Sequence, residues 1–142
     1  MKALEILLNE RMMTLVRAKS QNEGQALADA LVASGVKVIE ITLTTPGALK
    51  IIANLLKHKG LLVGAGTVRT VKDVKKVEDV GAKFIVSPDT NEDVIAATKK
   101  LKLVSMPGVC TPTEVAIAEE SGADILKLFP ASILGPGAFK DA

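Results

Sequence analysis

The sequence predicts an α/β fold in which strands and helices alternate and the strands form a parallel sheet. Three observations predict it: short apolar runs alternate with longer amphipathic stretches, glycines end most of the expected helices, and these breaks recur about every 21 residues. A unit of that length holds one strand, one helix and two short loops. The 142 residues are expected to form one domain, 1–142, that buries roughly 70% of its unfolded surface.

Six apolar runs have the length and the flanking residues of buried strands. They are 12–18, 37–43, 61–65, 83–87, 102–106 and 124–129. Five helices are expected between them. Their starts are marked by Ser20, Pro46, Thr70 and Thr111, and their ends by Gly35, Gly60, Gly81, the glycine-free break near Leu101, and Gly122.

The alternation of side chains along two strands favours a closed barrel over an open sheet. In the second strand Glu40 shares a face with Val38 and Thr42, and in the sixth strand Lys127 shares a face with Phe129. Helices would cover both faces of an open sheet, and burying the two charges there is costly unless they are paired. In a barrel, both side chains would face the interior.

A barrel of this kind needs eight strand–helix units, whereas about six are present. The sequence stops at 137–142, which we interpret as the beginning of a further helix. We therefore expect either that the sequence is truncated at its C-terminal end or that the units complete their sheet with another chain.

The composition argues against several classes of function. A formal charge of +2, with three Phe and no Trp or Tyr, is unlike a nucleic-acid-binding surface. One cysteine and one histidine supply no cluster of metal ligands and no disulfide, so we expect no metal, no cofactor and a reducing compartment. The sequence has no signal-peptide pattern and no apolar run of about 18 residues. We expect a cytoplasmic protein that binds neither nucleic acid nor membrane.

Lys127 is the candidate nucleophile, because it lies within the apolar run of the sixth strand. Burial favours the neutral amine, which can attack a ketone and form a Schiff base. Glu40 is the candidate proton carrier for that chemistry. The alternative for both is a structural ion pair between them. The position of Lys127 near a strand C-terminus, where barrel enzymes keep their sites, favours catalysis.

The other strand ends are rich in hydroxyl groups and glycine, which suits close approach of a carboxylate or phosphate to the backbone. These ends contain Thr42, Thr44 and Thr45, then 64–67 with Gly66 and Thr67, then Ser87 and Pro88, then 106–108 with Pro107. Arg17 ends the first strand. It is either a surface residue or a bidentate ligand for an anionic substrate.

These segments together resemble the KDPG/KHG aldolase family. The resemblance is carried in order by EITLTT at 40–45, GAGTV at 64–68, FIVSP at 84–88, MPGVCTPTE at 106–114 and LKLFPA at 126–131. It implies a (β/α)8 barrel of the TIM-barrel type and a homotrimer. It also implies class I cleavage of 2-dehydro-3-deoxy-6-phosphogluconate to pyruvate and glyceraldehyde 3-phosphate, and in some members of 4-hydroxy-2-oxoglutarate to pyruvate and glyoxylate.

The resemblance also assigns residue roles. Lys127 matches the Schiff-base lysine and Glu40 the acid/base, while Thr67 matches a ligand of the pyruvate carboxylate. The chain departs from the family at Thr44, where many members have Arg, so carboxylate binding would rest on Arg17 and Thr67. Pro88 and Phe129 are expected to line the pocket.

The family's last two strands, with a Gly-rich phosphate site, have no counterpart in the sequence, so phosphorylated substrates are expected to bind poorly. The alternatives are an inactive fragment that self-associates through open edges and another phosphate-binding barrel with a structural lysine.

Overall fold

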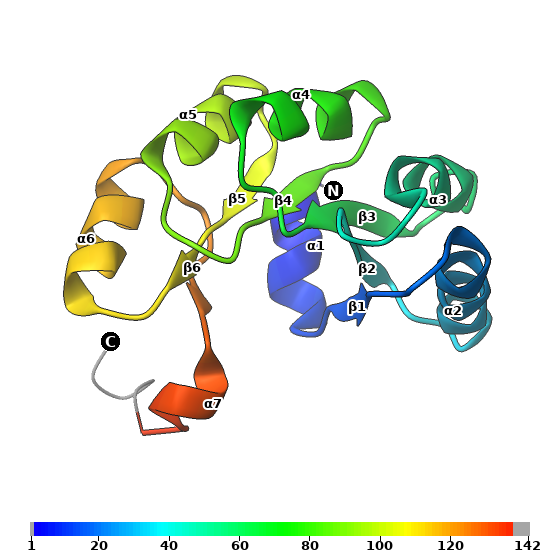
Figure 1. Cartoon of the computed structure of the whole chain (residues 1–142), viewed down its shortest axis with the longest axis horizontal. Coiled ribbons are helices and arrows are strands. Elements are labelled where there is room, and N and C mark those ends of the chain that lie inside the picture. The colour runs from blue at the N-terminus through cyan, green and yellow to red at the C-terminus, as the bar shows by residue number, and fades with distance from the viewer. Residues whose placement is uncertain (1, 138–142) are drawn as a thin grey trace.

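The computed structural model describes residues 2–137, and its strands form two parallel sheets (Figure 1). The larger sheet has the order β1-β2-β3-β4-β5, so each strand lies beside its neighbour in sequence. Its strands are β1 (Thr14–Val16), β2 (Val38–Thr42), β3 (Leu62–Gly66), β4 (Phe84–Val86) and β5 (Val104–Met106). The smaller sheet pairs β6 (Gly108–Val109) with β7 (Lys127–Leu128).

The helices that connect these strands lie along the outer side of the sheet (Figure 1). They are α2 (Gln21–Ala33), α3 (Ala48–Leu55), α4 (Val71–Asp79), α5 (Glu92–Lys100) and α6 (Pro112–Glu120). Two further helices are α1 (Ala3–Glu10), which lies on the inner side of the arc, and α7 (Ala131–Leu134), which follows β7. Within residues 2–137 the arc stays open, with β1 and β5 at the edges of the larger sheet. The fold is a partial βα barrel.

The predicted order of elements is confirmed. Each of the six expected strands overlaps an observed one, although 12–18 and 124–129 shrink to three and two residues. The sequence analysis missed α1, α7 and β6, which Pro107 separates from β5. The helix start expected at 137–142 falls, apart from Gly137, outside the described residues.

The predicted helix ends at Gly35, Gly81 and Gly122 are confirmed, but the end predicted at Gly60 and one predicted start are wrong. The helix α3 ends at Leu55, and Gly60 lies in the turn that follows. All four glycines have φ between 81° and 95°, the left-handed conformation that glycine adopts without strain. At the glycine-free break, Lys102 takes that conformation instead, with φ 60°. Ser20, Thr70 and Thr111 each accept a hydrogen bond from the backbone three residues on. Pro46 is not in the first turn of α3, because Gly47 is the N-cap.

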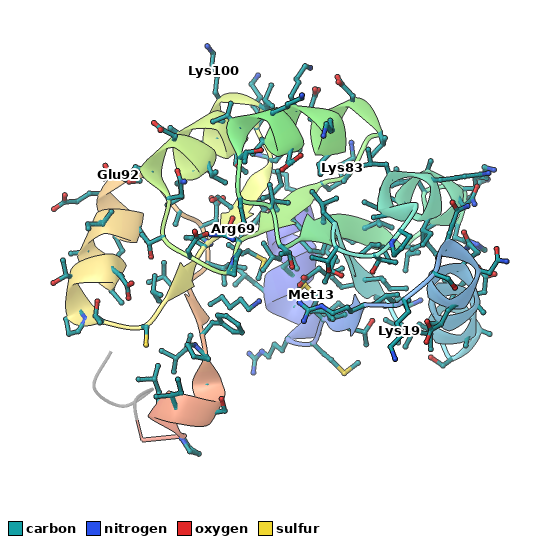
Figure 2. The ribbon with its side chains drawn as sticks, viewed as in Figure 1. Met13, Lys19, Arg69, Lys83, Glu92 and Lys100 are labelled. Carbon is teal, nitrogen blue, oxygen red and sulfur yellow. The ribbon has the colours of Figure 1, made fainter. Side chains whose placement is uncertain are left out.

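The sheet separates two apolar clusters, which confirms the predicted alternation of faces. The outer cluster joins Ile39 and Ile41 of β2 to the helices. The inner cluster contains Val38 and Phe84, and α1 packs against it through Leu7. In Figure 2, Met13 lies toward the inside of the arc, whereas Lys100 and Glu92 point outward. The part of the inner face that α1 covers is apolar. Polar groups lie on the same face toward the C-terminal ends of the strands.

Candidate active site

Glu40 occupies the middle of β2 on the inner face of the sheet. It pairs in register with Leu15 of β1 and with Gly64 of β3, and it is only 1% exposed. Two of the three inward positions of β3 are glycines, and the space left by each is occupied. The Phe84 ring fills the space beside Gly64, and the Glu40 carboxylate fills the space beside Gly66. A side chain at residue 66 would overlap Glu40 Oε1.

The Glu40 carboxylate is buried with an incomplete set of partners. Its Oε2 atom has no hydrogen-bond partner in the described part of the chain, although such buried oxygens almost always have one. Burial raises the pKa of Glu40 above its ordinary value, and the positive charges of Lys127 and then Arg17 oppose that rise. A carboxyl group whose pKa is raised by burial and lowered by nearby positive charge can both hold a proton and give it up.

Lys127 lies in β7 and is electrostatically coupled to Glu40 without touching it. Neither it nor Arg17 lies within 4.0 Å of the Glu40 oxygens, so the interpretation of Glu40 and Lys127 as a structural ion pair is wrong. The backbone N–H of Lys127 donates to Pro107 O at 2.9 Å, and its Nζ lies 4.8 Å from the centroid of the Phe129 ring. The amine therefore lies over an aromatic face and forms no ion pair with a carboxylate of residues 2–137.

The burial expected for Lys127 is found only in part. The residue is half-buried, and Phe129 is 42% exposed. The physical reason is that β7 pairs only with the two residues of β6, so among the described residues no strand covers its other side.

A cluster of threonine hydroxyls fixes the backbone around Arg17. Thr42 donates to Val16 O at 3.3 Å, and the N–H of Ala18 donates to Thr45 Oγ1 at 3.1 Å. The two hydroxyls are also 3.1 Å apart, and both residues are buried. Arg17 lies between these two bonded positions, so the end of β1 is held against the end of β2. Its side chain remains exposed.

Thr44 continues this cluster toward solvent. Its hydroxyl donates to Thr42 Oγ1 at 3.1 Å, and the residue is exposed. The rest of its surface is free to meet a ligand.

Thr67 and Pro88 form the next part of the same rim. Thr67 follows β3 with φ 57°, a conformation that is strained for a β-branched residue, and such strain collects at functional sites. Pro88 follows β4, and its carbonyl lies so close to Gly108 that any side chain there would overlap it. Thr90 closes the contact by donating to Gly108 O at 2.7 Å. The loop after β4 is thereby packed against β6.

The predicted site residues other than Glu40 and Lys127 lie at or just beyond a strand C-terminus. Glu40 is in the middle of β2, and Lys127 is the first residue of the two-residue strand β7. Because parallel strands end on the same side of a barrel, the strand-end positions share one rim. In chain order they are Arg17 after β1, Thr44 after β2, Gly66 and Thr67 at the end of β3, Pro88 after β4, Pro107 between β5 and β6, and Phe129 after β7.

Sequence reasoning missed Lys99 and Asp124, which form the one partly buried ion pair among the described residues. Nothing in the sequence marks them, because they are 25 positions apart in α5 and in the segment before β7.

Neither a metal site nor a membrane span is found in residues 2–137. No group of three or more His, Cys, Asp and Glu side chains there could hold a metal ion. None of the described helices has the length and apolar character needed to cross a membrane.

Residues 4–140 match the family described as KDPG and KHG aldolase. A "Probable 2-dehydro-3-deoxy-6-phosphogalactonate aldolase" of Rhizobium meliloti is 39% identical over 127 residues, which are 88% of this chain and 60% of that protein.

Two solved structures have the same arrangement. The 2-keto-3-deoxy-6-phosphogluconate aldolase of Zymomonas mobilis ZM4, solved with 3-phosphoglycerate, has a TM-score of 0.83 at 34% identity, covering 91% of this chain and 62% of that one. The KDPG aldolase of Legionella pneumophila, solved with pyruvate captured as a covalent carbinolamine, has a TM-score of 0.80 at 32% identity, covering 91% and 64%. The chain thus spans about 60% of the length of these proteins, and over that span it belongs to the KDPG and KHG aldolase family.

Proposed function

We propose that this chain carries the Schiff-base centre of a class I aldolase that releases pyruvate from a 2-oxo acid. The observation that carries the proposal is the pair formed by Glu40 and Lys127: a buried carboxylate with one unpartnered oxygen, and an amine that acts on it electrostatically without forming an ion pair. The carbinolamine captured in the Legionella pneumophila relative supports the same chemistry.

In the proposed reaction, the neutral amine of Lys127 adds to the C2 ketone of the substrate and forms a carbinolamine. Glu40 gives a proton to the departing hydroxyl, water leaves, and an iminium ion remains. The C3–C4 bond then breaks: its electron pair moves toward the iminium nitrogen and forms an enamine, while the C4 hydroxyl gives its proton to the Glu40 carboxylate and becomes an aldehyde. Protonation of the enamine at C3 and addition of water release pyruvate and restore the amine.

The rim around this pair suits the carboxylate end of the substrate. Thr67 offers a hydroxyl and a strained backbone next to Gly66, and Arg17 offers a guanidinium on a backbone held by hydrogen bonds. We assign both to the substrate carboxylate, with Thr44 beside them. Pro88, Pro107 and Phe129 form the less polar wall of the pocket.

The names of the matching proteins and of the family give three candidate substrates, two phosphorylated and one unphosphorylated. The phosphogluconate and phosphogalactonate acids differ in configuration at C4, the carbon that becomes the aldehyde, while 4-hydroxy-2-oxoglutarate lacks the phosphate. We propose 2-dehydro-3-deoxy-6-phosphogluconate as the substrate, with 4-hydroxy-2-oxoglutarate as a second one. We propose that the protein is a homotrimer and that it is located in the cytoplasm.

The test is a cleavage assay with the three acids, in which released pyruvate is measured by its reduction to lactate. We expect pyruvate from the wild-type chain and none from Lys127→Met, with circular dichroism showing that both are folded. Equal turnover by both proteins would reject Lys127 as the nucleophile. A folded wild-type chain without turnover would support the alternative of an inactive, self-associating fragment, which sizing would reveal.

A further inference from the structure

Lys127 lies on a strand that its own sheet holds only weakly. β7 has two residues, and it pairs with two residues of β6, outside the five-stranded sheet. The backbone bonds on either side are Lys127 N to Pro107 O at 2.9 Å and Phe129 N to Val109 O at 3.0 Å. A ladder of two short strands is marginally stable by itself. The position of the amine relative to Glu40 must therefore depend on contacts elsewhere.

The segment entering β7 is fixed by Asp124, three residues before the lysine. Its carboxylate accepts from Lys99 Nζ at 2.5 and 2.6 Å, through both oxygens, and from the backbone N–H of Ser105 at 2.8 Å. In return, Ser105 O accepts from the N–H groups of Asp124 at 3.0 Å and Ile125 at 3.2 Å. Five contacts thus join the start of this segment to the middle of β5 and to the last turn of α5.

The environment makes these contacts stronger than those of an ordinary surface pair. The Asp124 side chain is 16% exposed and that of Lys99 is 36% exposed, whereas the ion pairs of α4 involve lysines that are 48% and 59% exposed. Charge-assisted hydrogen bonds gain strength as water is excluded, and exposed pairs contribute little. Removing Lys99 would leave a half-buried carboxylate without its counter-charge.

We infer that Asp124, held by Lys99, is a positioning residue that sets the distance from the Lys127 amine to Glu40. The three residues from Asp124 to Lys127 span at most about 10 Å of chain, so a displacement of Asp124 is passed on to the strand that carries the amine. This inference rests on the proposed Schiff-base function. Neither Lys99 nor Asp124 touches substrate in this role, and both act through the placement of β7.

The first experiment measures the initial rate of reductive trapping of pyruvate on Lys127 with cyanoborohydride, as a function of pyruvate concentration. Lys99→Met is the test variant, Lys99→Arg the conservative one, and Lys75→Met the matched control, since it breaks exposed ion pairs on α4. We expect Lys99→Met to lower the limiting rate by roughly ten- to a hundredfold, as a small misplacement of a reacting group does. Half-saturation should stay within about twofold, because Arg17 and Thr67 still bind the carboxylate. Lys99→Arg should restore most of the rate, and Lys75→Met should not lower it.

A second measurement separates this inference from the proposed function. Hydrogen exchange of the Lys127 and Phe129 amides reports the opening of β7 without any chemistry. We expect faster exchange there in Lys99→Met and unchanged exchange in Lys75→Met. If the wild type traps no pyruvate, the proposed function fails while exchange still decides whether Lys99 holds β7. A folded Lys99→Met chain with wild-type trapping rate and wild-type exchange overturns the inference. Should Lys99→Met not fold, Asp124→Asn, which keeps an oxygen for the Ser105 N–H, takes its place with the same expectations.

Discussion

Gly66 and Glu40 share one space: the carboxylate of Glu40 lies where a side chain of residue 66 would be. The two residues are on neighbouring strands, with Thr42 as the register partner of Gly66. Glycine at this position therefore allows a charged group to be buried inside the sheet. Gly64 does the same for the Phe84 ring, so two successive inward positions of β3 lack a side chain and leave room for residues of the neighbouring strands.

Replacing Gly66 with Ala should displace the Glu40 carboxylate. The backbone of residue 66 is not in the left-handed region, so the new methyl group is the whole perturbation. We expect about 1–3 kcal/mol of lost stability from overpacking and about a hundredfold loss of pyruvate release, the usual size of a lost acid–base contribution. Gly137→Ala is the control, because nothing lies within 4 Å of a Cβ there. Wild-type turnover in Gly66→Ala would show that the carboxylate position does not matter.

Replacing Glu40 with Gln should change how stability depends on pH. Burial raises the pKa of Glu40 above its ordinary value of 4.5, so the folded chain holds this proton more tightly than the unfolded chain does. Between pH 4.5 and the folded pKa the wild type loses stability as pH rises, and above that window the loss is complete. The stability of Glu40→Gln relative to wild type should therefore be greater at about pH 8 than at pH 4.5. Thermal melts at the two values check this, and a difference that does not change with pH contradicts it.

Replacing Thr67 with Gly should weaken pyruvate binding and leave the stability of the fold almost unchanged. Glycine tolerates the observed φ of 57°, so relief of strain should offset the greater freedom of the unfolded chain and leave stability within about 1 kcal/mol of wild type. The lost hydroxyl should weaken pyruvate binding by about tenfold, the worth of one hydrogen bond. Thr67→Ser keeps the hydroxyl and should bind as wild type does. Equal half-saturation values for all three proteins would remove Thr67 from the site.

Replacing Thr111 with Ala should disturb the loop that carries β6. The Thr111 hydroxyl accepts from the N–H of Glu114, and Glu114 Oε2 accepts from the N–H groups of Cys110 and Thr111 at 2.8 Å. These bonds, that to Cys110 first, lower the pKa of Glu114. Loss of the cap should cost about 1 kcal/mol.

Ser20→Ala removes the equivalent cap of α2 and is the matched control. Both variants should lose similar stability in denaturant melts, and only Thr111→Ala should slow trapping at Lys127. A slower reaction in both would mean that trapping reports overall stability.

Much of this architecture can be predicted from the sequence because it depends on local chemistry. The glycines that end helices, the capping residues and the two-residue alternation of β2 all follow from contacts within a few positions. They predict on which face of the sheet Glu40 lies and at which end of the strands the site residues meet.

The errors come from contacts between distant parts of the chain. Full burial of Lys127 requires strands on both sides of β7, and only one is present among the described residues. The Lys99–Asp124 pair depends on how α5 packs against the entry to β7, which residue order does not show. The sequence predicts a break near Leu101, but it does not show that Lys102 takes the left-handed conformation there.

The most direct test of the account is the mass of the peptide that contains Lys127 after the folded chain has been treated with pyruvate and borohydride. Borohydride delivers hydride to the imine carbon and converts it to a stable secondary amine. The account predicts one such adduct, on Lys127 and on none of the other lysines, with strongly reduced formation in Glu40→Gln. An unmodified Lys127 peptide from a folded chain, or modification spread over the exposed lysines, would contradict it.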